Sequence, residues 1–180
     1  MPEVSTATMN APLVWPQARR IKLISLIFGL IVVIDQLTKQ WAISTLRGHR
    51  PSVYLGNLFR LEYAENPGAF LGLGSSMPAA VRFWLMTVAV AGILVICMVY
   101  VLRDRKLSAM ATLGFSLVTS GGFSNLLDRI FRTEGKVVDF MNMGVGELRT
   151  GIFNVADMAI MGGIFLVLIH LMKEQKADQA

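Results

Sequence analysis

Four long apolar runs constrain this chain more than any other feature. They cover residues 23–43, 79–102, 107–127 and 152–172. At about 1.5 Å of helix rise per residue, each run is long enough to cross the roughly 30 Å hydrocarbon core of a bilayer. Backbone that crosses a bilayer must satisfy its own hydrogen bonds, so the runs predict helices. We therefore expect a mainly α membrane protein, with four transmembrane helices in one domain over residues 21–172.

The charged residues support a membrane protein. Only 16% of the 180 residues are charged, whereas soluble domains carry about a quarter. The net charge of +5 comes from basic residues near the ends of the runs, a distribution that indicates membrane flanks and not nucleic-acid binding. Residues 1–20 are expected to be a flexible cytoplasmic tail and residues 173–180 a cytoplasmic C-terminal tail. Residues 1–17 lack the apolar core of a removable signal peptide.

Basic residues also give a weak signal of orientation. One side of the four runs carries eight lysines and arginines and the other carries seven. The eight lie in much shorter segments, and dense basic charge in short segments favours the cytoplasm. This density predicts that both termini are cytoplasmic.

The segment between the first two runs has a different pattern. Residues 52–63 are rich in Val, Tyr, Leu and Phe with rough alternation, interrupted by Gly56 and Asn57. This pattern is typical of two short strands joined by a turn. We expect a small extracytoplasmic β platform between the first and second helices.

Ionisable and amide side chains cluster near the outer ends of the runs. Asp35 and Lys39 are four residues apart and can pair on one helix face, and Asn125 and Arg129 have the same spacing. The other members of this cluster are Asn66, Asp139, Asn154 and Asp157. An ionisable residue within a membrane helix costs about 3 kcal/mol and usually has a function. Clustering on one side predicts a site at a membrane interface instead of a polar path through the bilayer.

Asp139 and Asp157 are the candidates for catalysis. Asp139 ends a short apolar stretch and Asp157 begins a long one, so folding back can bring them face to face. Two close carboxylates can share one proton, so that one activates water while the other polarises a carbonyl. His49 and His170 are far apart, and no His-Glu-x-x-His motif occurs. We therefore expect no zinc centre and no other cofactor.

Two other functions fit the residues alone. A proton-coupled carrier could use Asp35 and Asp157 as a relay, although no inverted repeat is visible. A membrane assembly protein could hold its aspartates in ion pairs with Arg129 or Lys39. Charge within a membrane indicates function without naming it, so the residues by themselves leave enzyme, carrier and scaffold open.

Five motifs, in this order, resemble those of the lipoprotein signal peptidase family (signal peptidase II). The motifs are Asp35-Gln36-Leu37-Thr38-Lys39, Glu65-Asn66-Pro67-Gly68-Ala69-Phe70, Gly121-Gly122-Phe123-Ser124-Asn125-Leu126-Leu127-Asp128-Arg129, Val137-Val138-Asp139-Phe140 and Phe153-Asn154-Val155-Ala156-Asp157. Each motif alone is weakly specific, but their order and spacing on a chain with four apolar runs are strongly specific. The resemblance covers residues 22–172.

The resemblance implies an aspartic endopeptidase of the bacterial inner membrane with its site at the periplasmic face. Such enzymes remove signal peptides from prolipoproteins, just before a cysteine that carries diacylglycerol. Asp139 and Asp157 would be the catalytic pair. The residues that would shape the site and hold substrate are Asp35, Lys39, Asn66, Gly121, Asn125, Arg129, Asn154 and Ala156. The expected partners are these prolipoproteins and membrane lipids, and the expected state is a monomer.

Overall fold

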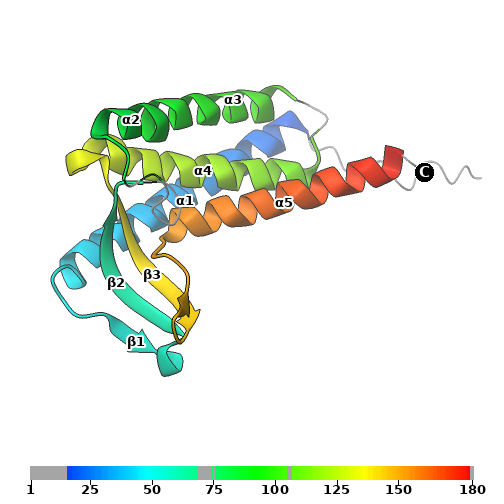
Figure 1. Cartoon of the computed structure of the whole chain (residues 1–180). Coiled ribbons are helices and arrows are strands. Elements are labelled where there is room, and N and C mark those ends of the chain that lie inside the picture. Colours follow the sequence, from blue (N-terminus) through cyan, green and yellow to red (C-terminus); the bar gives the residue numbers. More distant parts are fainter. Residues whose placement is uncertain (1–15, 69–73, 75, 105–106, 179–180) are drawn as a thin grey trace, which may run out of the picture.

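The computed structural model describes residues 16–68, 74, 76–104 and 107–178. Its long helices are α1 (Gln17–Thr45), α4 (Ala109–Phe131) and α5 (Val155–Asp178), together with a further helix assembled from α2 (Ala79–Phe83), the π-helical η4 (Trp84–Ala89) and α3 (Val90–Arg103). These helices form an elongated bundle, and a small sheet extends from one end of it (Figure 1).

Three helices of the described chain are long and apolar enough to cross a membrane: Gln17–Thr45, Ala79–Arg103 and Val155–Lys176. This confirms the membrane protein and its mainly helical class. The fourth expected span corresponds to α4, which has 23 residues but is more polar. Its hydroxyl side chains are buried, and those of Ser116, Thr119 and Ser120 donate to carbonyls three or four residues earlier in the helix. Such internal bonds make polar residues tolerable at membrane depth.

The central helix is α4, which packs against α1, α3 and α5. Its approach to α5 depends on glycine. A Cβ on Gly114 would lie 2.9 Å from the carbonyl oxygen of Gly163, and a Cβ on Gly163 would lie 2.5 Å from that of Gly114. Real Cβ atoms essentially never come so close, so only small residues allow the two backbones to touch.

The sheet has four antiparallel strands in the order β1-β2-β3-β4. Strands β1 (Ser52–Tyr54) and β2 (Phe59–Asn66) form the predicted hairpin, and the short 3-10 turn η2 (Leu55–Asn57) joins them. Gly56 has φ +62° in this turn, a conformation that glycine adopts without strain.

The sheet is larger than expected. Strands β3 (Val137–Val145) and β4 (Leu148–Arg149) come from the connection between α4 and α5, after the 3-10 turn η5 (Thr133–Gly135). The platform therefore does not arise only between the first two helices, because β2 pairs with a strand some eighty residues later in the chain. This pairing places Asp139 within strand β3, opposite Ala64 of β2.

The ends of the bundle also differ from the sequence expectation. Helix α1 begins at Gln17 and α5 continues to Asp178, so helix occupies parts of both expected tails, while residues 1–15 lie outside the described chain. Arg20 is buried instead of solvated, because its guanidinium donates to the carbonyl of Val101, 2.6 Å away, near the C-terminal end of α3. Arg105 and Lys106 are two of the eight basic residues counted on the side expected to be cytoplasmic, and both lie outside the described residues.

Candidate active site

Strand β3 and helix α5 bring Asp139 and Asp157 into one site. Phe153, just before α5, forms an isolated antiparallel bridge with Met141 of β3. The amide of Met141 donates to the Phe153 carbonyl at 2.9 Å, and the amide of Phe153 donates back at 2.8 Å. This bridge fixes the first turn of α5 beside Asp139, so the chain folds back as the sequence suggested.

Both carboxylate oxygens of Asp139 accept amide hydrogen bonds. Asn66 on β2 donates from Nδ2 to Oδ2 at 2.9 Å, and Asn154 donates from Nδ2 to Oδ1 at 2.6 Å. Asn66 can reach across the strands because Asp139 lies opposite Ala64, two residues from Asn66 on the same face. The Asp139 side chain is thereby held from both sides.

Asp157 is held at the beginning of α5 by a reciprocal cap. The amide of Asp157 donates to Oδ1 of Asn154 at 2.9 Å, and the amide of Asn154 donates to Oδ2 of Asp157 at 3.2 Å. This is the geometry of a capping box, with an acidic residue three positions after the cap. Asn154 therefore precedes the helix and does not share a helix face with Asp157. The other carboxylate oxygen of Asp157 accepts from Nδ2 of Asn125 at 2.9 Å.

Asn154 contacts both candidate catalytic residues. It is fully buried and reaches Asp139 through its side chain and Asp157 through its main chain and side chain. Its Nδ2 also donates to Oδ1 of Asn125 at 3.2 Å. The two asparagines thus join both carboxylates in one hydrogen-bonded cluster.

The surroundings of Asp139 favour its protonated form. Burial, followed by the nearby negative charge of Asp157, raises the pKa of Asp139 to about 7, although hydrogen bonds from Asn66 and Asn154 oppose the shift. A carboxyl group with a pKa near neutrality can hold a proton at working pH and release it during a reaction. This property fits a carboxylate pair that shares a proton.

The ion pair predicted between Asp35 and Lys39 is present at 2.7 Å, but it is buried within the protein and not exposed at the membrane interface. Oδ1 of Asp35 accepts from the amide of Ala156 at 2.8 Å, so a carboxylate of α1 stabilises the positive N-terminal end of α5. Lys39 donates to Oδ1 of Asn125 at 2.8 Å. Asp35 and Lys39 therefore hold α5 and Asn125 in place without lining the groove that leads to the site.

Asp128 is a member of this support that sequence reasoning left out of the candidate site. It is almost completely buried, and it pairs with Lys39 at 3.0 Å and with Arg132 at 2.8 Å. Its Oδ2 also accepts from the amide of Val138, 3.1 Å away, immediately before Asp139. Two features of the sequence could have identified Asp128: it lies four positions before Arg132, and it belongs to the motif that runs from Gly121 to Arg129.

Arg129 holds the connections that surround the site. Its guanidinium donates to the carbonyls of Pro67, Gly68 and Gly135. These carbonyls belong to the segment after β2 and to η5, so Arg129 ties both to α4. Ala69 and Phe70, the last residues of the second motif, lie outside the described chain.

Gly121 and Ala156 determine how closely α4 approaches the site. A Cβ on Gly121 would lie 2.4 Å from the carbonyl oxygen of Ala156, the residue before Asp157. Gly121 is therefore required for close contact of the two helices, and neither residue offers a chemically reactive side chain.

A groove of about 310 Å³ leads to the cluster from the side of the bundle. Asn125, Arg129 and Asp157 provide its polar lining, and the rest is apolar, with Met86, Val90, Gly122, Leu126, Ile160, Met161 and Ile164. Over the described ranges, no group of three or more His, Cys, Asp or Glu side chains is arranged to hold a metal ion. The groove itself presents one carboxylate, one amide and one guanidinium.

The fold and the site define a class: a helical membrane protein with a carboxylate cluster where bundle and sheet meet. A solved bacterial membrane enzyme, crystallised by the in meso method, has the same fold with a TM-score of 0.73 at 24% identity, covering 86% of this chain and 90% of that one. A second such structure gives a TM-score of 0.72 at 23% identity.

Sequence comparison gives the family. The family model described as signal peptidase (SPase) II matches residues 27–173, and the chain belongs to this family of peptidases. A lipoprotein signal peptidase of Oleidesulfovibrio alaskensis is 34% identical over 87% of this chain and 98% of its own length. Those of Syntrophus aciditrophicus and Bifidobacterium adolescentis are 30% and 38% identical, over 82% and 79% of this chain and 91% and 73% of their own lengths.

Proposed function

We propose that this chain is an aspartic endopeptidase that removes the signal peptide from prolipoproteins carrying a diacylglyceryl cysteine, cutting just before that cysteine. Membership of the signal peptidase II family and the relatives named lipoprotein signal peptidase support the substrate class. The observation that carries the catalytic assignment is the single buried Asn154, which contacts both Asp139 and Asp157. The carrier and scaffold hypotheses do not account for this arrangement, because neither requires two carboxylates around one shared amide.

In the proposed mechanism, Asp139 and Asp157 share one proton and activate a water molecule. The ionised carboxylate takes a proton from water while the protonated one donates a hydrogen bond to the scissile carbonyl. The proton then passes to the departing nitrogen, so the pair returns to its starting charge. Asn66, Asn125 and Asn154 hold the two carboxylates, and the Asp35–Lys39 pair holds the first turn of α5 behind them.

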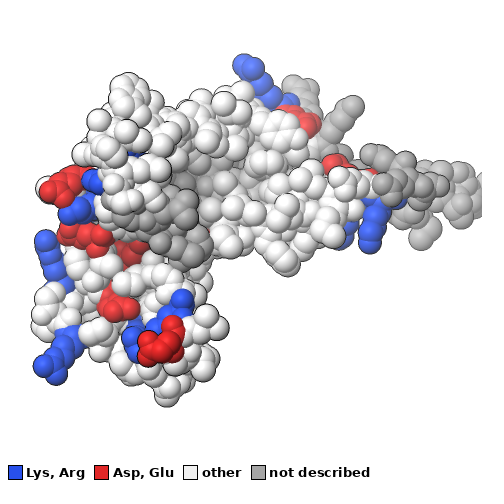
Figure 2. Space-filling view, in the orientation of Figure 1, with Lys and Arg blue, Asp and Glu red and all other residues white. Residues whose placement is uncertain are grey.

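We propose that α4 is the fourth span, that the protein is a monomer in the bacterial inner membrane, and that both termini are cytoplasmic. The site would then lie at the periplasmic face. Charged side chains gather at the two ends of the bundle, with an uncharged surface between them that suits the bilayer (Figure 2). At this level the acyl chains of the substrate can stay among membrane lipids while the scissile bond reaches the aspartates.

The test is cleavage of a diacylglyceryl-modified prolipoprotein peptide by the purified protein in detergent. The parent should cut before the modified cysteine, and Asp139→Asn and Asp157→Asn should each lose activity while remaining folded. Asp104→Asn, just beyond α3 at the opposite end of the bundle, is the matched control and should stay active. An inert parent would reject the proposed function. Near-parental activity in either active-site variant would reject the obligatory pair, whereas the carrier and the scaffold would be favoured only by an inert parent.

A further inference from the structure

Lys39 is a buried cation among the charged residues beneath the site. Its side chain is completely buried, and its Nζ lies 2.7 Å from Oδ2 of Asp35, 3.0 Å from Oδ2 of Asp128 and 2.8 Å from Oδ1 of Asn125. We infer that the positive charge of Lys39, and not only its packing, keeps the catalytic pair in the state with one shared proton. Lys39 is then a positioning residue that sets the pH range of cleavage. This inference rests on the proposed function and adds an electrostatic role to it.

The contacts of Lys39 require its charged form. A lysine ammonium offers three N–H donors, and the three acceptors around Nζ use all of them. The two carboxylates among these acceptors are ionised, because they also accept their other hydrogen bonds. Oδ1 of Asp35 accepts from the amide of Ala156 at 2.8 Å, and its Oδ2 accepts from the hydroxyl of Ser124 at 2.7 Å. A carboxylate that accepts from several donors is stabilised as the anion.

Asp128 is held as an anion in the same way. Its Oδ1 accepts from Nε of Arg132 at 2.8 Å, and its Oδ2 accepts from the amide of Val138 at 3.1 Å. Lys39 and Arg132 therefore balance the two buried carboxylates of Asp35 and Asp128. Loss of the Lys39 charge would leave a negative charge without compensation in the protein interior, and such an excess favours proton uptake by neighbouring carboxylates.

Asn125 connects Lys39 to the catalytic pair. Its Oδ1 accepts from Lys39 at 2.8 Å and from Nδ2 of Asn154 at 3.2 Å. Because both donors lie on the oxygen side of the amide, its Nδ2 faces the other way and donates to Oδ1 of Asp157 at 2.9 Å. One side-chain amide therefore separates the ammonium from a catalytic carboxylate, and salt screens buried charges only weakly.

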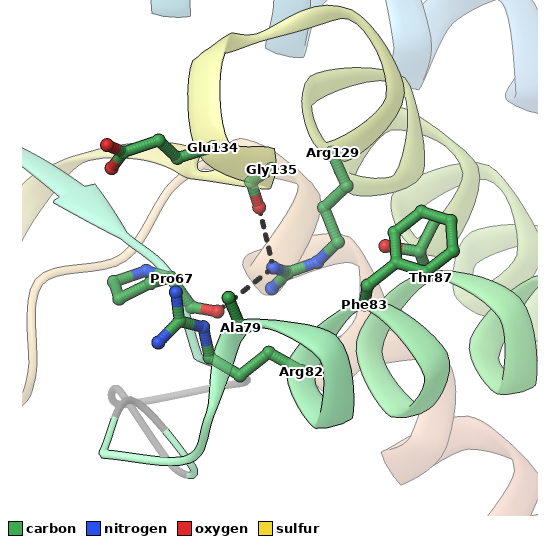
Figure 3. A pocket seen from close by; sticks show the side chains of 8 residues that line it. All are labelled: Pro67, Ala79, Arg82, Phe83, Thr87, Arg129, Glu134 and Gly135. Carbon is green, nitrogen blue, oxygen red and sulfur yellow. Dashed lines mark hydrogen bonds between the residues drawn. The ribbon is translucent and has the colours of Figure 1, made fainter.

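The charge of Lys39 also acts on the other member of the pair. Burial, followed by the charge of Asp157, raises the pKa of Asp139, and the positive charge of Lys39 is among the effects that oppose this rise. Lys39 therefore favours release of one of the two protons that the pair can carry. Arg129 is a further cation on which Asp139 acts, but its guanidinium bonds to neutral carbonyls (Figure 3). Other charged side chains on the surrounding elements include Asp35 on α1, Glu65 on β2, Arg82 on α2, and Asp128 and Arg132 on α4.

The experiment measures the pH dependence of kcat/KM for the diacylglyceryl-modified peptide, because its two limbs report the titration of the essential acid and base in the free enzyme. Lys39→Met removes the charge and keeps a long apolar side chain. Both limbs should move upward by about one pH unit, as for a unit charge removed several ångströms away in a protein interior. A packing role alone would lower the rate without moving the limbs. Lys39→Arg keeps the charge and should keep the parental limbs, whatever its rate.

Asp35→Asn changes the charge in the opposite direction. It leaves the charge of Lys39 less compensated, so both limbs should move downward. The double variant Lys39→Met/Asp35→Asn removes one charge of each sign and should bring the limbs back to the parental pH. The matched control is Lys173→Met, at the exposed far end of α5, which should leave the limbs unchanged. Thermal unfolding of each variant shows whether it is folded.

Unmoved limbs in a folded Lys39→Met protein would overturn the inference and leave Lys39 with a packing role alone. The inference would also be overturned if the double variant or Lys39→Arg showed the full upward shift, or if Lys173→Met moved the limbs as far. If Lys39→Met does not fold, Asp35→Asn decides, since a downward shift supports the inference and unmoved or raised limbs overturn it. A parent that cleaves no peptide would reject the proposed function, and the inference with it.

Discussion

Gly121→Ala tests whether the contact between α4 and α5 sets the position of Asp157. The added Cβ would lie 2.4 Å from the carbonyl oxygen of Ala156, and ordinary contact begins at 3.4 Å, so this oxygen must retreat by about 1 Å. The amide of Ala156 is bonded to Asp35, and Asp157 follows directly, so the retreat would shift the catalytic carboxylate. Misplacement by about 1 Å can cost about 100-fold in rate.

The effect on stability should be smaller than the effect on activity. Overpacking costs about 1–3 kcal/mol, whereas alanine gains about 1 kcal/mol over glycine within a helix, so the net loss should stay below about 2 kcal/mol. The matched control is Gly162→Ala on α5, where nothing lies within 4 Å of the new Cβ. We expect this control to be active and as stable as the parent, or slightly more stable.

Cleavage rates and thermal unfolding should be measured for both variants in the same detergent. A folded Gly121→Ala protein with a rate reduced by about two orders of magnitude supports the argument. The reasoning is refuted if Gly121→Ala cleaves at the parental rate. It is also refuted if Gly162→Ala loses as much activity, because that loss would reflect glycine itself and not the helix contact.

Two further predictions concern charge. The pKa of Asp139 is raised to about 7 in the folded protein, from about 3.9 in an unfolded chain. Between these two pH values the folded state binds more protons than the unfolded state. The contribution of Asp139 to stability should therefore fall as the pH rises from about 4 to 7. Thermal unfolding across this range should show that slope, Asp139→Asn should flatten it, and cleavage by the parent should decline above about pH 7. A parental slope in Asp139→Asn would contradict the assignment. Asp128→Ala should lower the free energy of unfolding by about 3 kcal/mol, because Lys39 and Arg132 lose a buried partner. Glu134 is exposed, so Glu134→Ala should lower it by less than about 1 kcal/mol. Equal losses of stability in the two variants, measured by thermal unfolding, would contradict the role of burial.

The sequence was sufficient for features that depend on local spacing. The apolar runs predicted the helices, and the four-residue separation of Asp35 and Lys39 predicted their ion pair, which is present. The turn at Gly56 and Asn57 predicted the β1–β2 hairpin, which is also present. Each of these features depends on residues that are close together in the sequence.

Features that depend on contacts between distant segments could not be predicted in the same way. Strand β3 follows no clean alternation, and it forms because β2 offers it a partner. The role of Asn154 as a helix cap depends on where α5 begins, and the Phe153 bridge to β3 sets that position.

The polarity of α4 has consequences for biogenesis. A helix with a seam of serine and threonine at Thr112, Ser116, Ser120 and Ser124 partitions into lipid less readily than its neighbours. During synthesis α1 is available before α4 emerges, whereas α5, which supplies the closest backbone contact, follows only after β3 and β4. We expect the newly made α4 to remain near the insertion machinery until α5 arrives. A chain that ends before residue 155 lacks α5, so we expect it to expose this polar seam to lipid and to be degraded as a misassembled membrane protein.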